Sequence, residues 1–142
     1  MSAITHEQSL EQFHEQLAYV LANYHSHGKS ISNYNNVVIG GLGGSGIGGR
    51  IARLAFLQQS PVPVEVFSEY GLPAYADEKT LVILCSYSGN TEETLSMFAQ
   101  SKSKGCDMIC VAAAGKLKDL AAEHSLAYYS VALGYQPRMT LG

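Results

Sequence analysis

Hydrophobic residues along the chain follow two spacings, one typical of helices and one typical of buried strands. From residue 5 to about residue 27 they recur every three or four positions, and Thr5 with Gln8 matches a capping box, so we expect a helix that packs its apolar face inward. Short β-branched or aliphatic runs then alternate with helical patterns. The predicted strands are 37–39, 62–67, 81–85, 108–111 and 126–133, and the later predicted helices are 47–57, 91–104 and 116–124.

This alternation predicts the fold class. Apolar strands separated by single helices form parallel sheets, because each right-handed crossover returns the chain to the same end of the sheet. We therefore expect an α/β domain with a doubly wound, five-stranded parallel sheet flanked by helices. Residues 1–142 form one domain in this prediction, since no linker or low-complexity tract divides them. No helix is predicted after the fifth strand, which suggests a longer natural chain.

Composition narrows the possible partners. Of 142 residues, 46% are hydrophobic and 15% are charged, with a formal net charge of −3, so we expect neither nucleic acid nor a membrane as a partner. The N-terminal segment carries three glutamates and lacks the pattern of a secretory signal, which favours a cytoplasmic protein. The three cysteines are expected to be small buried hydrophobes, and no cysteine or histidine spacing predicts a metal site.

The first unusual loop follows the first strand. Residues 40–49 hold seven of the fourteen glycines, a density that suits backbone amides approaching a ligand closely. A tight turn that packs a helix on a strand is the alternative. The spacing Gly41-x-Gly43-x-x-Gly46 also matches a dinucleotide fingerprint, but Glu69 lies 28 residues beyond Gly41 instead of about twenty.

The second unusual loop connects the third strand to a helix. Ser86, Ser88 and Thr91 place three hydroxyls where the unpaired amides and the positive dipole of a helix start collect, without any Lys or Arg. This combination predicts a phosphate site. Asn90 with Glu93 also predicts an N-cap for the same helix, which would not explain the three hydroxyls.

The segment Ser86-Tyr87-Ser88-Gly89-Asn90-Thr91 resembles the Ser-x-Ser-Gly-x-Thr loop of sugar isomerase (SIS) domains. Together with segments 43–46, 70–73 and 137–138, it resembles the N-terminal domain of the bifunctional phosphoglucose/phosphomannose isomerase family. The resemblance implies a flavodoxin-like SIS fold, a sugar phosphate ligand, no cofactor, and a second SIS domain or a homodimer partner. It also implies isomerisation of glucose 6-phosphate or mannose 6-phosphate to fructose 6-phosphate through an enediolate.

The resemblance assigns expected roles to six residues. Ser86, Ser88 and Thr91 would hold the sugar phosphate, Gly44 and Ser45 would line the same pocket, and Arg138 would stabilise the developing oxyanion as a catalytic cation. The family places its carboxylate base and ring-opening histidine in its second half. Residues 1–142 are therefore expected to bind without turnover. A phosphosugar-sensing module without catalysis and a dinucleotide-binding domain are the alternatives.

Overall fold

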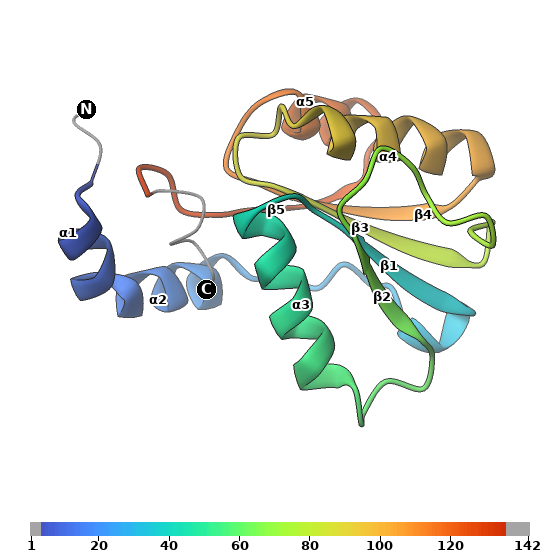
Figure 1. Cartoon of the computed structure of the whole chain (residues 1–142), viewed down its shortest axis with the longest axis horizontal. Helices are drawn as coiled ribbons and strands as arrows, with labels where there is room; N and C mark the ends of the chain where they lie inside the picture. Colours follow the sequence, from blue (N-terminus) through green and yellow to red (C-terminus); the bar gives the residue numbers. More distant parts are fainter. Residues whose placement is uncertain (1–3, 136–142) are drawn as a thin grey trace.

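The computed structural model describes residues 4–135, in which five parallel strands lie between helices (Figure 1). The strands are β1 (Asn36–Gly40), β2 (Val64–Phe67), β3 (Thr80–Ser86), β4 (Asp107–Ala112) and β5 (Ala127–Ser130). The helices are α1 (His6–Glu11), α2 (Phe13–Asn23), the 3₁₀ helix η1 (Ile31–Asn33), α3 (Gly44–Phe56), α4 (Glu92–Lys104) and α5 (Lys116–Glu123). The strand order is β2-β1-β3-β4-β5, with every neighbouring pair parallel, which confirms the predicted fold class.

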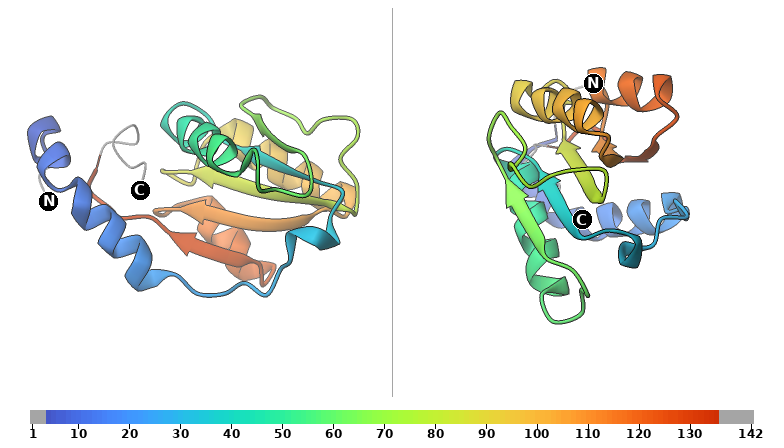
Figure 2. Two further views of the ribbon diagram at one scale, coloured as in Figure 1. Left: turned by 90° about the horizontal axis from the view of Figure 1, so that it is seen from below. Right: turned by 90° about the vertical axis from the view of Figure 1, so that its right-hand side faces the viewer.

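Helices cover the two faces of the sheet unequally. Helices α4 and α5 lie on one face and α3 lies on the other (Figures 1 and 2). The α4–α5 side carries the larger core, in which Val82, Leu84 and Leu117 are fully buried. Alternate residues of the same strands, such as Leu81 and Ile109, form a smaller core on the α3 side. The near-continuous apolar strands of the sequence therefore reflect burial on both faces.

The N-terminal helix differs from the prediction. The capping box of Thr5 and Gln8 is present, but the helix is interrupted at Gln12 and continues as α2. Its apolar residues, including Leu17, are exposed, whereas Gln16 is buried. The expected inward apolar face is therefore wrong. Figure 1 shows the reason, because α1 and α2 extend beyond the β5 side of the sheet and no described layer covers their outer face.

The strand order brings two loops together. The chain leaves β1 toward α3 on one face and leaves β3 toward α4 on the other, although β1 and β3 are neighbours. Loops diverge at such a switch point, beyond the carboxyl ends of the strands, and ligands of doubly wound sheets bind there. The glycine-rich loop and the hydroxyl-rich loop both lie at this point.

Among residues 4–135, no helix is both long and apolar enough to span a bilayer.

Candidate functional site

The glycine-rich loop and the hydroxyl-rich loop are joined by hydrogen bonds. The backbone N–H of Tyr87 donates to Ser45 Oγ at 3.2 Å, which places Ser45 beside the end of β3. Ser68, just after β2, donates from Oγ to the carbonyl oxygen of Gly41 at 2.7 Å. The ends of β1, β2 and β3 therefore fix the start of α3, where Gly44 is the first residue and Ser45 the second.

The three hydroxyls predicted for the phosphate lie around one turn. Ser86 Oγ and Thr91 Oγ1 are 2.8 Å apart, and the N–H of Gly89 donates to Ser86 Oγ at 3.1 Å. Ser88 Oγ accepts from the N–H of Asn90 at 3.2 Å. Ser86 is 2% exposed, Thr91 is half-buried and Ser88 is exposed. Thr91 and Ser88 are therefore more accessible to a ligand than Ser86, which is buried.

The start of α4 keeps its amides available. Thr91 is the N-cap residue, and no side chain of the described residues caps this helix. The Thr91 hydroxyl pairs with Ser86 instead, so the N–H groups of residues 92–94 are left for an anion. The predicted N-cap role of Asn90 is wrong. Its Oδ1 accepts from the N–H of Lys116 at 3.0 Å, so Asn90 serves the first turn of α5.

Two glycines lock the hydroxyl-rich loop onto the loop between β4 and α5. Gly89 has φ +70° and Gly115 has φ +80°, both in the left-handed region. A Cβ on Gly89 would collide with the carbonyl oxygen of Ala114. The N–H of Leu117 donates to the carbonyl oxygen of Gly89 at 2.9 Å, and the N–H of Ala113 donates to that of Tyr87 at 3.0 Å. The site is therefore set in a rigid backbone frame.

Part of the glycine-rich loop serves packing rather than a ligand. A Cβ on Gly46 would lie 2.6 Å from the carbonyl oxygen of Gly41, and one on Gly49 would lie 2.8 Å from Ile39 Cγ2. Both glycines are buried against the sheet. The packing alternative thus explains these positions. Gly43, the N-cap residue of α3, has φ +59°, and Gly44 is the first residue of that helix.

Tyr87 is a site residue that the sequence analysis missed. Its hydroxyl donates to the carbonyl oxygen of Ala132 at 3.2 Å and accepts from the N–H of Tyr135 at 3.0 Å. The hydroxyl-rich loop therefore holds the segment that follows β5. No local pattern signals this role, because the partners lie 45 and 48 residues away. Arg138, the expected catalytic cation, lies outside the described residues.

Carboxylates also lie at the start of α4. Glu92 and Glu93 occupy its first turn, and Glu92 Oε2 accepts from the Tyr70 hydroxyl at 3.1 Å. This hydrogen bond and the two negative charges raise the pKa of Tyr70 above its ordinary value. Within residues 4–135, no group of three or more His, Cys, Asp or Glu side chains could hold a metal ion.

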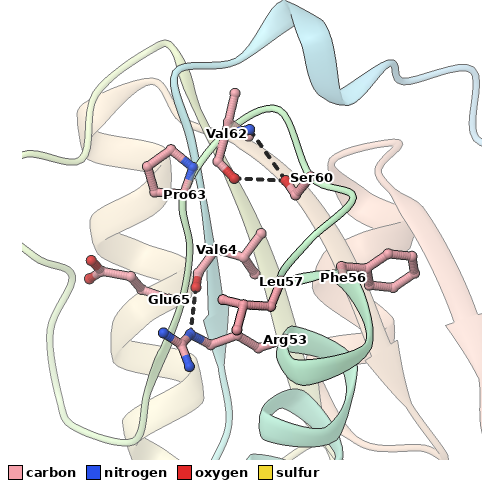
Figure 3. A pocket seen from close by; sticks show the side chains of 8 residues that line it. All are labelled: Arg53, Phe56, Leu57, Ser60, Val62, Pro63, Val64 and Glu65. Carbon is pink, nitrogen blue, oxygen red and sulfur yellow. Dashed lines mark hydrogen bonds between the residues drawn. The ribbon is translucent and has the colours of Figure 1, made fainter.

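A pocket of about 240 Å³ lies at the opposite end of the sheet (Figure 3). It is formed by the end of α3 and the start of β2. Within it, Arg53 Nε donates to the carbonyl oxygen of Val64 at 2.9 Å and Ser60 Oγ donates to that of Val62 at 2.7 Å. The pocket lies at the C-terminal end of α3, where the helix dipole disfavours an anion, whereas the loops at the switch point precede helix N-termini.

The strand order and the paired loops define a doubly wound α/β domain with a hydroxyl-rich loop at its switch point. The chain belongs to the SIS domain family, whose model matches residues 30–131. It is 45% identical to a bifunctional phosphoglucose/phosphomannose isomerase of Caldicellulosiruptor bescii over 127 residues, which are 89% of this chain and 38% of that protein. The protein of the same description from Aquifex aeolicus is 41% identical over 115 residues, or 80% of this chain and 36% of that one.

Solved structures agree on the fold. The Vibrio vulnificus NanR protein complexed with ManNAc-6P matches with a TM-score of 0.69 at 15% identity, over 92% of this chain and 52% of that one. The chain spans less than two-fifths of the length of the Caldicellulosiruptor bescii protein and of the Aquifex aeolicus protein.

Proposed function

We propose that this domain binds a hexose 6-phosphate at the hydroxyl-rich loop and serves phosphoglucose/phosphomannose isomerisation. The observation that carries the proposal is the cluster of Ser86, Ser88 and Thr91 around an uncapped helix start. Hydroxyls and amides can hold a phosphate without a cationic side chain, because a charged acceptor strengthens each hydrogen bond. Identity of 34–45% to four bifunctional phosphoglucose/phosphomannose isomerases supports the choice of ligand.

Ser45 and Gly44 form the second wall of the proposed site. Ser45 Oγ already accepts from the N–H of Tyr87, so its proton is available to donate to the ligand. Gly44 lacks a side chain at the first residue of α3, which lets the sugar phosphate approach that helix start. The ligand would then lie between two helix N-termini, α3 and α4, whose dipoles both favour its negative charge.

The proposed reaction moves a proton between C2 and C1 of the open-chain sugar. A base removes the C2 proton of the aldose, which gives an enediolate, and the same proton is returned to C1. The proton of the C2 hydroxyl passes to the C1 oxygen, so that C2 becomes the ketone and C1 carries the new hydroxyl. We propose Arg138 as the cation that stabilises the enediolate oxygen. The base and the ring-opening histidine would come from a second SIS unit. Residues 1–142 would then be the N-terminal domain of a longer two-domain chain.

Calorimetric titration of the 142-residue chain tests the binding step. Glucose 6-phosphate is expected to bind, while glucose and NADH are not. Ser88→Ala is expected to weaken binding about ten- to a hundredfold, because one hydrogen bond to a charged acceptor is worth roughly 1.5 to 3 kcal/mol. Ser103→Ala is the matched control, since Ser103 is also an exposed serine but lies near the far end of α4. Equal affinities for the two variants would remove the loop from the site.

A non-catalytic phosphosugar-binding module is the second candidate. The described site supplies groups that bind but no suitable base, because Glu92 and Glu93 would lie beside the bound dianion. A coupled assay for fructose 6-phosphate formation separates the two. The isomerase proposal expects turnover when the second SIS unit is present and none from residues 1–142 alone. Binding without turnover in the complete protein would favour the non-catalytic module.

A further inference from the structure

The segment 68–79, which joins β2 to β3, lies along helix α4 (Figure 1). It is held there by four polar side chains of α4 that are spaced four residues apart, so that each lies next to the following one on the helix surface. These side chains belong to Glu92, Ser96, Gln100 and Lys104. At the far end of the helix, Lys104 Nζ donates to the carbonyl oxygen of Ala76 at 3.0 Å. Residues 70–73 of this segment contribute to the family resemblance but have no role in the site described above.

The middle of this row of side chains fixes the backbone around Tyr70. Gln100 Nε2 donates to the Tyr70 carbonyl oxygen at 2.9 Å, and Ser96 Oγ donates to the same oxygen. The N–H of Leu72 in turn donates to Gln100 Oε1 at 3.1 Å. Tyr70 therefore has a defined position relative to α4, although its side chain lies at the surface.

The Tyr70 side chain reaches the candidate phosphate site. Its hydroxyl donates to Glu92 Oε2 at 3.1 Å, and Glu92 is the first residue of α4. Two residues before Tyr70, Ser68 Oγ donates to the carbonyl oxygen of Gly41 in the glycine-rich loop. The start of the segment 68–79 therefore spans from the glycine-rich loop to the start of α4. The hydrogen bond to Glu92 raises the pKa of Tyr70, so the hydroxyl keeps its proton and remains a donor.

An unrestrained Glu92 carboxylate would compete with a phosphate. A carboxylate in the first turn of a helix is attracted by the positive end of the dipole and by the unpaired N–H groups. The N–H groups of residues 92–94 are the ones that the proposed function assigns to the anion. A carboxylate that moves toward them would occupy these donors and would also repel the ligand. The hydrogen bond from Tyr70 holds Glu92 toward the segment 68–79 instead.

We propose that Tyr70 is a positioning residue for phosphate binding, whose hydroxyl holds the Glu92 carboxylate beside the segment 68–79 and keeps the start of α4 open to the anion. This role rests on the proposed function. Ser96 and Gln100 support it, because they fix the backbone from which the Tyr70 side chain extends. Loss of the Tyr70 hydroxyl therefore weakens phosphate binding only while residue 92 carries a negative charge.

Calorimetric titration with glucose 6-phosphate tests the proposal in the 142-residue chain and three variants, Tyr70→Phe, Glu92→Gln and the double variant. Tyr70→Phe alone is expected to weaken binding about two- to fivefold, the range typical of interactions between exposed charged groups. Added to Glu92→Gln, the same substitution is expected to leave the affinity of Glu92→Gln unchanged, because no carboxylate is left to position. Equal weakening in both backgrounds would overturn the proposal, since Tyr70 would then act without Glu92.

Tyr75→Phe is the control for loss of a tyrosine hydroxyl from the same segment. The Tyr75 hydroxyl also donates to a glutamate, Glu65 Oε2, at 2.7 Å, but Glu65 lines the pocket at the opposite end of the sheet. This variant is expected to bind glucose 6-phosphate as tightly as the unsubstituted chain. If Tyr75→Phe weakens binding as much as Tyr70→Phe does, the effect is a general one of the segment and the proposal is wrong.

Nuclear magnetic resonance of ¹³C-labelled tyrosines measures the contact between Tyr70 and Glu92 without a ligand. Glu92→Gln is expected to lower the pKa of Tyr70 toward its ordinary value, because the hydrogen bond to a carboxylate and one negative charge are lost. An unchanged Tyr70 pKa would overturn the proposal whatever the affinities are. If the pKa falls but the unsubstituted chain binds no glucose 6-phosphate, the proposed function fails and this role fails with it. If the unsubstituted chain binds and Tyr70→Phe binds equally well, only the role of Tyr70 is overturned.

Discussion

Substitution of Gly89 by alanine tests whether the conformation of the hydroxyl-rich loop depends on its contact with the loop between β4 and α5. Gly89 has φ +70°, and a Cβ at this position would collide with the Ala114 carbonyl oxygen. The left-handed conformation alone costs a residue with a Cβ about 1 to 2 kcal/mol. Separating the loops would also strain two backbone hydrogen bonds, from the N–H groups of Leu117 and Ala113, each worth about 0.5 to 1.5 kcal/mol. Gly89→Ala is therefore expected to destabilise the fold by about 2 to 5 kcal/mol.

Gly105→Ala provides the control. Gly105 ends α4 with φ +71°, nearly the same dihedral angle, but its Cβ would meet only Glu78 Cβ at 3.9 Å. This variant is expected to lose only the conformational contribution of about 1 to 2 kcal/mol. Urea unfolding followed by circular dichroism gives both free energies of unfolding. If Gly89→Ala lowers the free energy of unfolding no more than Gly105→Ala does, the close contact between the hydroxyl-rich loop and the β4–α5 loop does not stabilise the site, and the reasoning is refuted.

Two further substitutions test contacts that hold distant segments together. Tyr87→Phe removes the hydroxyl that binds the segment 131–135, so backbone amides in that segment are expected to exchange hydrogen faster; unchanged exchange would contradict a tether. Burial alone would raise the pKa of Asp107, but hydrogen bonds from Lys29 and Tyr34 outweigh it and hold the pKa below its ordinary value. Stability from this carboxylate is present above its unfolded pKa of about 3.9 and is lost as pH falls through the lower folded value. Asp107→Asn is therefore expected to lower Tm at pH 7 and to differ less from the unsubstituted chain near pH 3, whereas a difference independent of pH would refute this linkage.

The sheet was predictable from the sequence because its signals are local. Each strand is a short apolar run, and each helix between strands repeats at 3.6 residues, so all five strands and the helices α3, α4 and α5 were found. The prediction extended β5 to residue 133, whereas the strand ends at Ser130, because an apolar run does not show where pairing with β4 stops.

The hydroxyl-rich loop was predictable for the same reason, since Ser86, Ser88 and Thr91 lie within six residues. The roles of Asn90 and Tyr87 were not, because their partners, Lys116 and the segment after β5, are distant in sequence. The apolar face of α2 was expected to pack inward, whereas it is exposed. Periodicity identifies an apolar face but does not show whether that face packs on its own domain or on another surface.

The central claim is that a phosphate is held by hydroxyls and amides at the start of α4, and titration of the ¹⁵N-labelled chain with glucose 6-phosphate tests it most directly. The account predicts that the largest chemical shift changes occur at the amides of residues 86–94, with smaller changes at Ser45. Titration with glucose should leave these amides unchanged. Largest changes at the pocket between α3 and β2, with residues 86–94 unaffected, would contradict the account.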